Sequence, residues 1–203
     1  MIENFLRPAQ GPAEAGADAL RVIGALSVVV AAVFFDPTDA GVVAFALPGL
    51  VAPRFIGMRA GADAVVTVTL LVAAWSNVFD LYTTVYWWDD VIHFVCGGVV
   101  GVLMYLLLAH FRIVAVPGKT GFTTAGAAVL TALFGLALSA LWEMVEWFGY
   151  EYITTDIYVT YADTISDMAA GGLGALAAGV LLAFVPLLRP AVQMARPAST
   201  EAV

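Results

Sequence analysis

Six apolar segments, separated by short polar connections, restrict what this chain can fold into. They lie at about 17–35, 40–53, 62–80, 90–111, 121–149 and 162–188. Most have about the twenty residues that a helix needs to cross roughly 30 Å of hydrocarbon. A composition of 62% hydrophobic and 12% charged residues is typical of a multi-pass membrane protein. We therefore predict an all-α fold, a bundle of six transmembrane helices.

The second segment is the weakest of the six. It spans only about fourteen residues and contains Pro48-Gly49, which would kink it or make it re-entrant. The basic residues favour a full crossing, because the connections at 36–39, 81–89 and 150–161 contain none of them. All eight lie on the other side: Arg7, Arg21, Arg54, Arg59, Arg112, Lys119, Arg189 and Arg196. The positive-inside rule then predicts six crossings with both termini cytoplasmic.

This topology divides the chain into three parts. Residues 1–16 form an N-terminal polar arm, 17–188 a single six-helix transmembrane domain, and 189–203 a C-terminal cytoplasmic tail. The first residues lack a basic stretch followed by an apolar core, so we expect no cleaved signal peptide.

The acidic residues gather on the opposite side from the basic ones. The predicted outer side has eleven acidic residues and no lysine or arginine, a distribution that concentrates cations. The sequence contains no glycine-rich phosphate loop, no Gly-x-Ser-x-Gly motif and no basic face for nucleic acid. We therefore expect the lipid bilayer as a partner and no nucleic acid.

Three groups of ionisable residues have helical spacing at the outer ends of the last three segments. They are Asp89 and Asp90 with His93, Glu143 with Glu146, and Asp163 with Asp167. Spacings of three and four residues put each pair on one helix face. Ionisable side chains within membrane segments are costly, so they are functional candidates. We interpret them as one polar site built from three helices.

An ordinary structural role competes with this interpretation for some of these residues. Asp89, Asp90 and Asp163 stand where helices begin, and aspartate is a favoured N-cap. Glu143 and Glu146 are stronger candidates, because they lie near the end of their helix, where the dipole disfavours negative charge. Two ionised carboxylates side by side in an apolar segment repel each other unless a cation neutralises them.

A divalent metal ion is the cofactor that such a ligand set suits. Carboxylate oxygens with one imidazole fit Mg, Mn, Ca or Fe, and also Zn. The metal ligands would come from all seven residues: Asp89, Asp90, His93, Glu143, Glu146, Asp163 and Asp167. Among them His93, Glu143 and Glu146 are the candidate catalytic residues, with one glutamate as general base. The leading hypothesis is an enzyme that acts on a lipid-linked or small-molecule substrate at the outer leaflet, such as a lipid or envelope-precursor headgroup.

Two other classes of function remain open. A cation- or proton-coupled transporter would use the same acidic site, but the inner halves of the segments offer no ionisable residues to continue a path, and no inverted repeat is visible. A structural or regulatory membrane protein would bind a stabilising cation without turnover.

The fourth and sixth segments share a short pattern. Asp89-x3-His93 is followed by Gly97-Gly98, and Asp163-x3-Asp167 is followed by Gly171-Gly172. Small residues allow membrane helices to approach closely. We predict that these two helices are neighbours.

The same residues carry a resemblance to known families. The order Asp-x-x-His, Glu-x-x-Glu, Asp-x-x-x-Asp resembles that of the uncharacterised YjdF-like bacterial inner-membrane proteins, over roughly residues 60–185. More distantly the chain is similar to VanZ-like (teicoplanin-resistance-protein-like) membrane proteins, from which it departs at Glu146 and Gly171. The resemblance implies a multi-pass protein of the bacterial plasma membrane and no known activity.

Overall fold

The described residues, 1–190 of a computed structural model, form helices joined by short connections. The helices are α1 (Ile2–Leu6), α2 (Pro12–Phe34), α3 (Pro37–Ile56), α4 (Ala60–Val78), α5 (Leu81–Thr84), α6 (Trp88–His110), α7 (Thr124–Tyr152) and α8 (Tyr161–Leu181). Six of them, α2, α3, α4, α6, α7 and α8, are long and apolar enough to cross a membrane, so the predicted fold class is confirmed. Most of the predicted tail at 189–203, including Arg196, lies outside the described residues.

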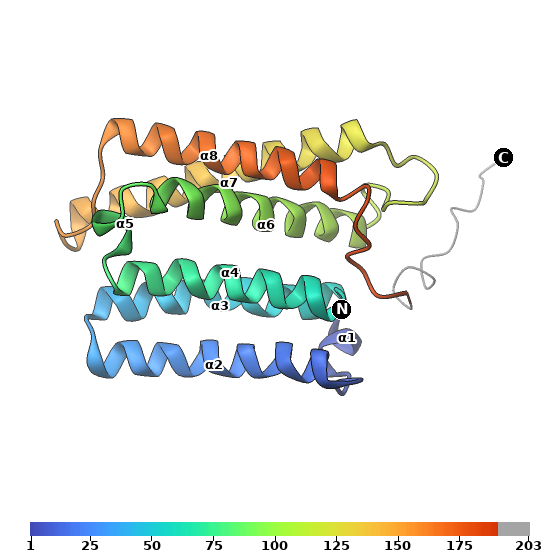
Figure 1. The fold of residues 1–203 in the computed structure, drawn as a ribbon, viewed down its shortest axis with the longest axis horizontal. Coiled ribbons are helices and arrows are strands. Elements are labelled where there is room, and N and C mark those ends of the chain that lie inside the picture. The colour runs from blue at the N-terminus through green and yellow to red at the C-terminus, as the bar shows by residue number, and fades with distance from the viewer. Residues whose placement is uncertain (191–203) are drawn as a thin grey trace.

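The six long helices form two groups of three. Helices α2, α3 and α4 pack together as one layer, and α6, α7 and α8 as the other (Figure 1). Helix α6 contacts α4 and α3 and so connects the two groups. A cluster of buried hydrophobic residues packs at this contact. It includes Val66 of α4, Leu106 of α6 and Leu182 after α8.

The two ends of the bundle differ, and we call them the outer and the inner end after the topology predicted from the basic residues. The outer end holds the first turns of α6 and α8, and the inner end holds the first turns of α2 and α4 (Figure 1). Helix α1 and the segment after α8 also meet at the inner end. There Phe5 stacks on Phe55 with ring centroids 4.4 Å apart, and Arg189 donates to Asn4 Oδ1 at 2.8 Å. Both ends of the described chain therefore lie on one side of the bundle.

Helix α3 is longer than its apolar segment at 40–53. It begins at Pro37, after a capping box between Asp36 and Asp39, and it ends where Gly57 adopts a left-handed conformation with φ 83°. Its 20 residues span about 30 Å, enough to cross a bilayer. Pro48 and Pro53 are accommodated inside it. The expected six spans therefore include the weak second segment.

Helices α6 and α8 approach closely through glycine, which confirms that they are neighbours. A Cβ on Gly97 would overlap the backbone of Gly171, and one on Gly98 would lie 3.1 Å from the Gly174 carbonyl oxygen. Gly172 differs from its predicted role, because a Cβ there would meet Leu136 of α7 instead. The close contacts with α6 are made by Gly171 and, about one helical turn further along, by Gly174.

Candidate functional site

The outer end of the second helix group brings three helix termini together. Helices α6 and α8 begin there, and α7 ends there (Figure 1). Each terminus carries one of the polar groups that the sequence singled out. The close packing of α6 on α8 below them, at Gly97 and Gly171, leaves the two first turns side by side.

The ring of His93 lies between carboxylates of two helices. Its Nε2 is 3.3 Å from Asp89 Oδ1 on the same helix, and its Nδ1 is 3.9 Å from Glu143 Oε1 on α7. The side chains of His93 and Glu143 are buried, with 11% and 6% of their surface exposed. Both ring nitrogens therefore face a carboxylate. A histidine that binds a metal through one ring nitrogen commonly donates its other N–H to such a carboxylate, which fixes the ring orientation.

Two sets of three potential ligands share this histidine. Asp89, His93 and Asp167 form one set, and His93, Glu143 and Glu146 form the other. In each set the ligand atoms all lie within 4.8 Å of one another. Five of the predicted ligands are thus brought together by α6, α7 and α8. Their oxygen-rich donors with a single nitrogen match the preferences of hard or borderline divalent metals.

One buried oxygen in the cluster lacks a hydrogen-bond donor. Glu143 Oε1 is inaccessible to solvent and accepts no hydrogen bond from residues 1–190. Within the same residues, His93 supplies every ion pair of these carboxylates, and no lysine or arginine joins them. A buried carboxylate oxygen without a donor is costly to maintain, so this oxygen favours the binding of a cation or a proton.

The other two predicted ligands are placed differently. Asp90 is exposed and belongs to neither set, because it points about 100° away from Asp89 around α6 and faces a groove between α6 and α8. Asp163 is half-buried in the first turn of α8 and close enough to interact electrostatically with Asp89 and His93. Neither of them, nor Asp89, is an N-cap residue, because Trp87 and Thr160 occupy those positions. Asp163 nevertheless takes part in capping α8, because its carboxylate accepts a hydrogen bond from the backbone of Thr160, whose hydroxyl in turn accepts one from the Asp163 backbone.

Comparison with known proteins gives a family for this chain. A family model described as "Predicted membrane protein (DUF2238)" matches residues 19–187. The chain belongs to this family. All seven candidate residues of this DUF2238 member fall inside the matched region. No curated protein and no solved structure matches the chain.

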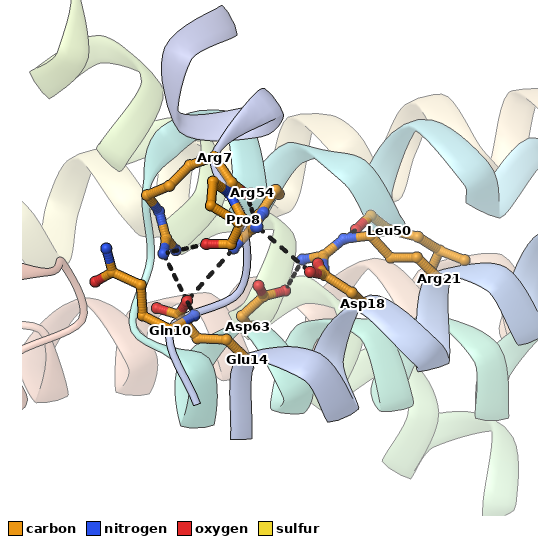
Figure 2. Close-up of polar contacts among 9 residues, drawn as sticks. All are labelled: Arg7, Pro8, Gln10, Glu14, Asp18, Arg21, Leu50, Arg54 and Asp63. Carbon is orange, nitrogen blue, oxygen red and sulfur yellow. Dashed lines mark hydrogen bonds and ion pairs between the residues drawn. The ribbon is translucent and has the colours of Figure 1, made fainter. Parts of the chain in front are cut away.

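A second cluster of charged residues, at the inner end, was missed by the sequence argument. It joins the N-terminal arm to α2, α3 and α4 through Arg7, Glu14, Asp18, Arg21, Arg54 and Asp63 (Figure 2). Arg21 pairs with both Asp18 and Asp63, while Arg54 contacts Asp18 at 3.3 Å. Asp63 and Arg54 are buried ionisable residues at the inner ends of α4 and α3. They belong to the other helix group from the outer site, so they do not continue a path from it.

Only part of this inner network could be inferred from the sequence. Asp18 and Arg21 are three residues apart on one helix and so form a readable pair. Their contacts with Arg54 and Asp63 join three helices and depend on how those helices pack. Arg54 also donates to the carbonyl of Arg7 at 2.5 Å, which anchors the N-terminal arm. The network holds the first helix group together at its inner end.

Proposed function

We propose that this DUF2238 protein is a metal-dependent membrane enzyme whose metal site is the outer cluster. The metal would be Mg, Mn, Fe or Zn, held by Asp89, His93, Asp167, Glu143 and Glu146, with Asp163 beside them. The observation that carries the proposal is the position of His93, shared by two sets of carboxylates, next to a buried glutamate oxygen without a donor.

The chemistry follows from the ligand set. A divalent ion polarises a phosphoryl or carbonyl oxygen of the substrate and stabilises the charge that develops on it. Glu143 or Glu146, whichever is not needed as a ligand, would serve as general base for an attacking water. Because the cluster lies at the ends of three candidate membrane helices, its substrate would be a lipid or an envelope-precursor headgroup.

The orientation is also a proposal. The distribution of basic residues supports cytoplasmic termini, which would put the cluster at the outer leaflet of a bacterial plasma membrane. The order of acidic and histidine motifs supports a relation to the YjdF-like proteins and a more distant one to the VanZ-like group.

A coupled cation or proton transporter is the second candidate. The observation in its favour is that the inner network contains buried charged residues. Asp63 and Arg54 are buried ionisable residues at the opposite end of the bundle. However, the network belongs to α2–α4 and the outer cluster to α6–α8, so the two do not form one path. A non-catalytic protein that binds a stabilising cation would have the same metal site without turnover.

Metal content tests the proposal directly. We expect purified protein, stripped with chelator and reloaded, to retain a stoichiometric divalent metal in elemental analysis. Glu146→Gln keeps the side-chain shape but removes a charge, so it should lose metal, as should His93→Ala. Binding should also weaken as the pH falls, because protons compete with the metal for its ligands.

Glu151→Gln is the matched control, since Glu151 is exposed near the end of the same helix. This variant should bind metal like the wild type. A wild-type protein that retains no metal after reloading, or equal losses in Glu146→Gln and Glu151→Gln, would contradict the proposal.

A further inference from the structure

A groove runs along the surface between α6 and α8, next to the outer cluster. Val91 and Phe94 of α6 and Ala169, Ala170 and Leu173 of α8 line it, and its volume is about 450 Å³. Its walls remain open, because Phe94 and Leu173 are 42% and 60% exposed. Below the groove the two helices come into backbone contact, since a Cβ on Gly174 would overlap the Phe94 carbonyl.

The chemistry of the groove changes along its length. Its deeper lining is aliphatic or aromatic and belongs to two candidate membrane spans, where the surrounding medium is hydrocarbon. Its outermost lining residues are polar: Asp90 on α6 and Ser166 on α8. A molecule that fits both parts has an apolar chain and a polar head, and the head must suit a carboxylate.

The charge at the outer end narrows the choice of head. Among residues 1–190, the outer ends of the helices and their connections contain no lysine or arginine. Asp90 is exposed and forms no ion pair with a described residue, so it is available to a cation from outside the chain. A purely anionic headgroup would be repelled there, whereas an ammonium group would be attracted.

We propose that the groove binds an acyl chain of an aminophospholipid, with the ammonium group of its headgroup against Asp90. Asp90 follows Asp89, a member of the candidate metal site, so a headgroup held there lies beside the outer cluster. The inference rests on the proposed function and deepens it, because it names an aminophospholipid as the substrate class. The groove holds the chain and positions the headgroup for the metal-dependent step.

Photo-crosslinking of the full chain in nanodiscs tests this binding. The probes are phosphatidylethanolamine and phosphatidylglycerol, each with a diazirine in the acyl chain, and labelled peptides are located by mass spectrometry. We expect the ethanolamine lipid to label α6 and α8 peptides about two- to fivefold more than the glycerol lipid, the preference that one exposed ion pair gives. Asp90→Lys should reverse the preference while leaving the fold intact, because its side chain is exposed.

Two tryptophan variants distinguish the groove from general contact with lipid. Ala169→Trp fills the groove and should abolish labelling there, while Leu176→Trp changes an exposed residue of α8 outside the groove and should not. Equal labelling by both lipids, or equal labelling of both tryptophan variants, would overturn the inference. A native mass spectrum with two chains and no lipid would also overturn it, because a second copy would then cover the groove.

The metal site and the lipid site can fail separately. Glu146→Gln should lose metal and keep the lipid preference, since Glu146 is on α7 and does not line the groove. Stoichiometric metal without a lipid preference would refute the aminophospholipid and leave the metal-dependent function standing. A lipid preference in a wild-type protein that binds no metal would refute the metal-dependent function instead.

Discussion

Arg21 contacts two aspartates whose surroundings differ. The Asp63 side chain is only 5% exposed, and its pairing with Arg21 crosses from α4 to α2. The Asp18 side chain is 38% exposed and lies on the same helix as Arg21. A carboxylate in water is stabilised by solvent whether or not it is paired, but a buried one depends on its partner. The two residues therefore allow a buried and a half-exposed partner of one guanidinium to be compared, although Asp18 also contacts Arg54 at 3.3 Å.

We predict that Asp63→Asn destabilises the bundle much more than Asp18→Asn. Breaking the buried pair leaves the Arg21 charge with less compensation and should lower the free energy of unfolding by about 3–5 kcal/mol. The exposed pair should account for no more than about 1 kcal/mol. Unfolding in mixed micelles, followed by circular dichroism, measures both. Similar losses in the two variants would show that apolar packing, rather than the Arg21–Asp63 pair, joins α2 to α4.

Single residues of the outer cluster were only partly predictable. Helical spacing correctly grouped His93 with an aspartate, but it allowed both Asp89 and Asp90 as partners. Consecutive helical residues point about 100° apart, so both cannot face the same neighbours. Which of them faces α7 and α8 depends on the rotation of α6 in the bundle, and the sequence does not contain that information. The structure turns Asp89 toward the cluster and Asp90 toward the groove.

At the scale of helices, hydropathy predicted the elements better than their ends. Helix α3 extends beyond its apolar segment because its first turn is a polar capping box and its last turn contains Arg54. Helix α2 likewise begins at Pro12, within the stretch expected to be an arm. Polar residues at helix ends are invisible to an argument based on apolar length. Proline at the first turn and glycine after the last are the signals that mark such ends.

Gly174 and Gly172 give a matched prediction about the α6–α8 contact. A methyl group at position 174 would overlap the Phe94 backbone, which cannot move without shifting α6. Gly174→Ala should therefore destabilise the bundle by about 1–3 kcal/mol, as overpacking does. At position 172 the same methyl group would meet Leu136 Cδ1 at 3.5 Å, an ordinary contact. Gly172→Ala should stay within about 1 kcal/mol of the wild type, because alanine favours helix.

Thermal unfolding of the two variants in detergent, with metal bound and after chelation, checks this. The order Gly174→Ala below Gly172→Ala should hold in both conditions, since the contact is independent of the ligands. Equal melting temperatures for the two variants would mean that α6 and α8 do not approach each other as closely as the glycines suggest.

For the whole molecule, the odd number of helices in each group has a consequence. Helix α2 begins at the inner end, so the first helix of the second group, α6, begins at the outer end. The inner network and the outer cluster thus occupy opposite ends of different groups. The sequence revealed this polarity through its charges, because every described lysine and arginine lies toward the inner end. It could not reveal which helices form each group, since apolar faces in a lipid environment carry little pattern.

Cysteine accessibility tests the orientation of the whole bundle. Thr155 lies in the α7–α8 connection at the outer end, and Thr120 in the α6–α7 connection at the inner end, and both are exposed. Gly61, at the start of α4, is exposed and has open space around an added Cβ. Positions 57 and 116 are buried, so a lack of labelling there would not report the side of the membrane.

With Cys96 replaced by alanine, an impermeant maleimide applied to intact cells should label Thr155→Cys and leave Gly61→Cys and Thr120→Cys unlabelled. All three should react after permeabilisation, since each is accessible on its own side. Labelling of Gly61→Cys but not Thr120→Cys from outside would mean that α4 and α6 do not both cross the membrane, because these two helices separate the two positions. Labelling of both, with Thr155→Cys protected, would mean that α6, α7 and α8 have the inverted orientation, either because the whole bundle is inverted or because α3 does not cross. The acidic cluster would then lie at the cytoplasmic leaflet, where its substrate would have to be sought.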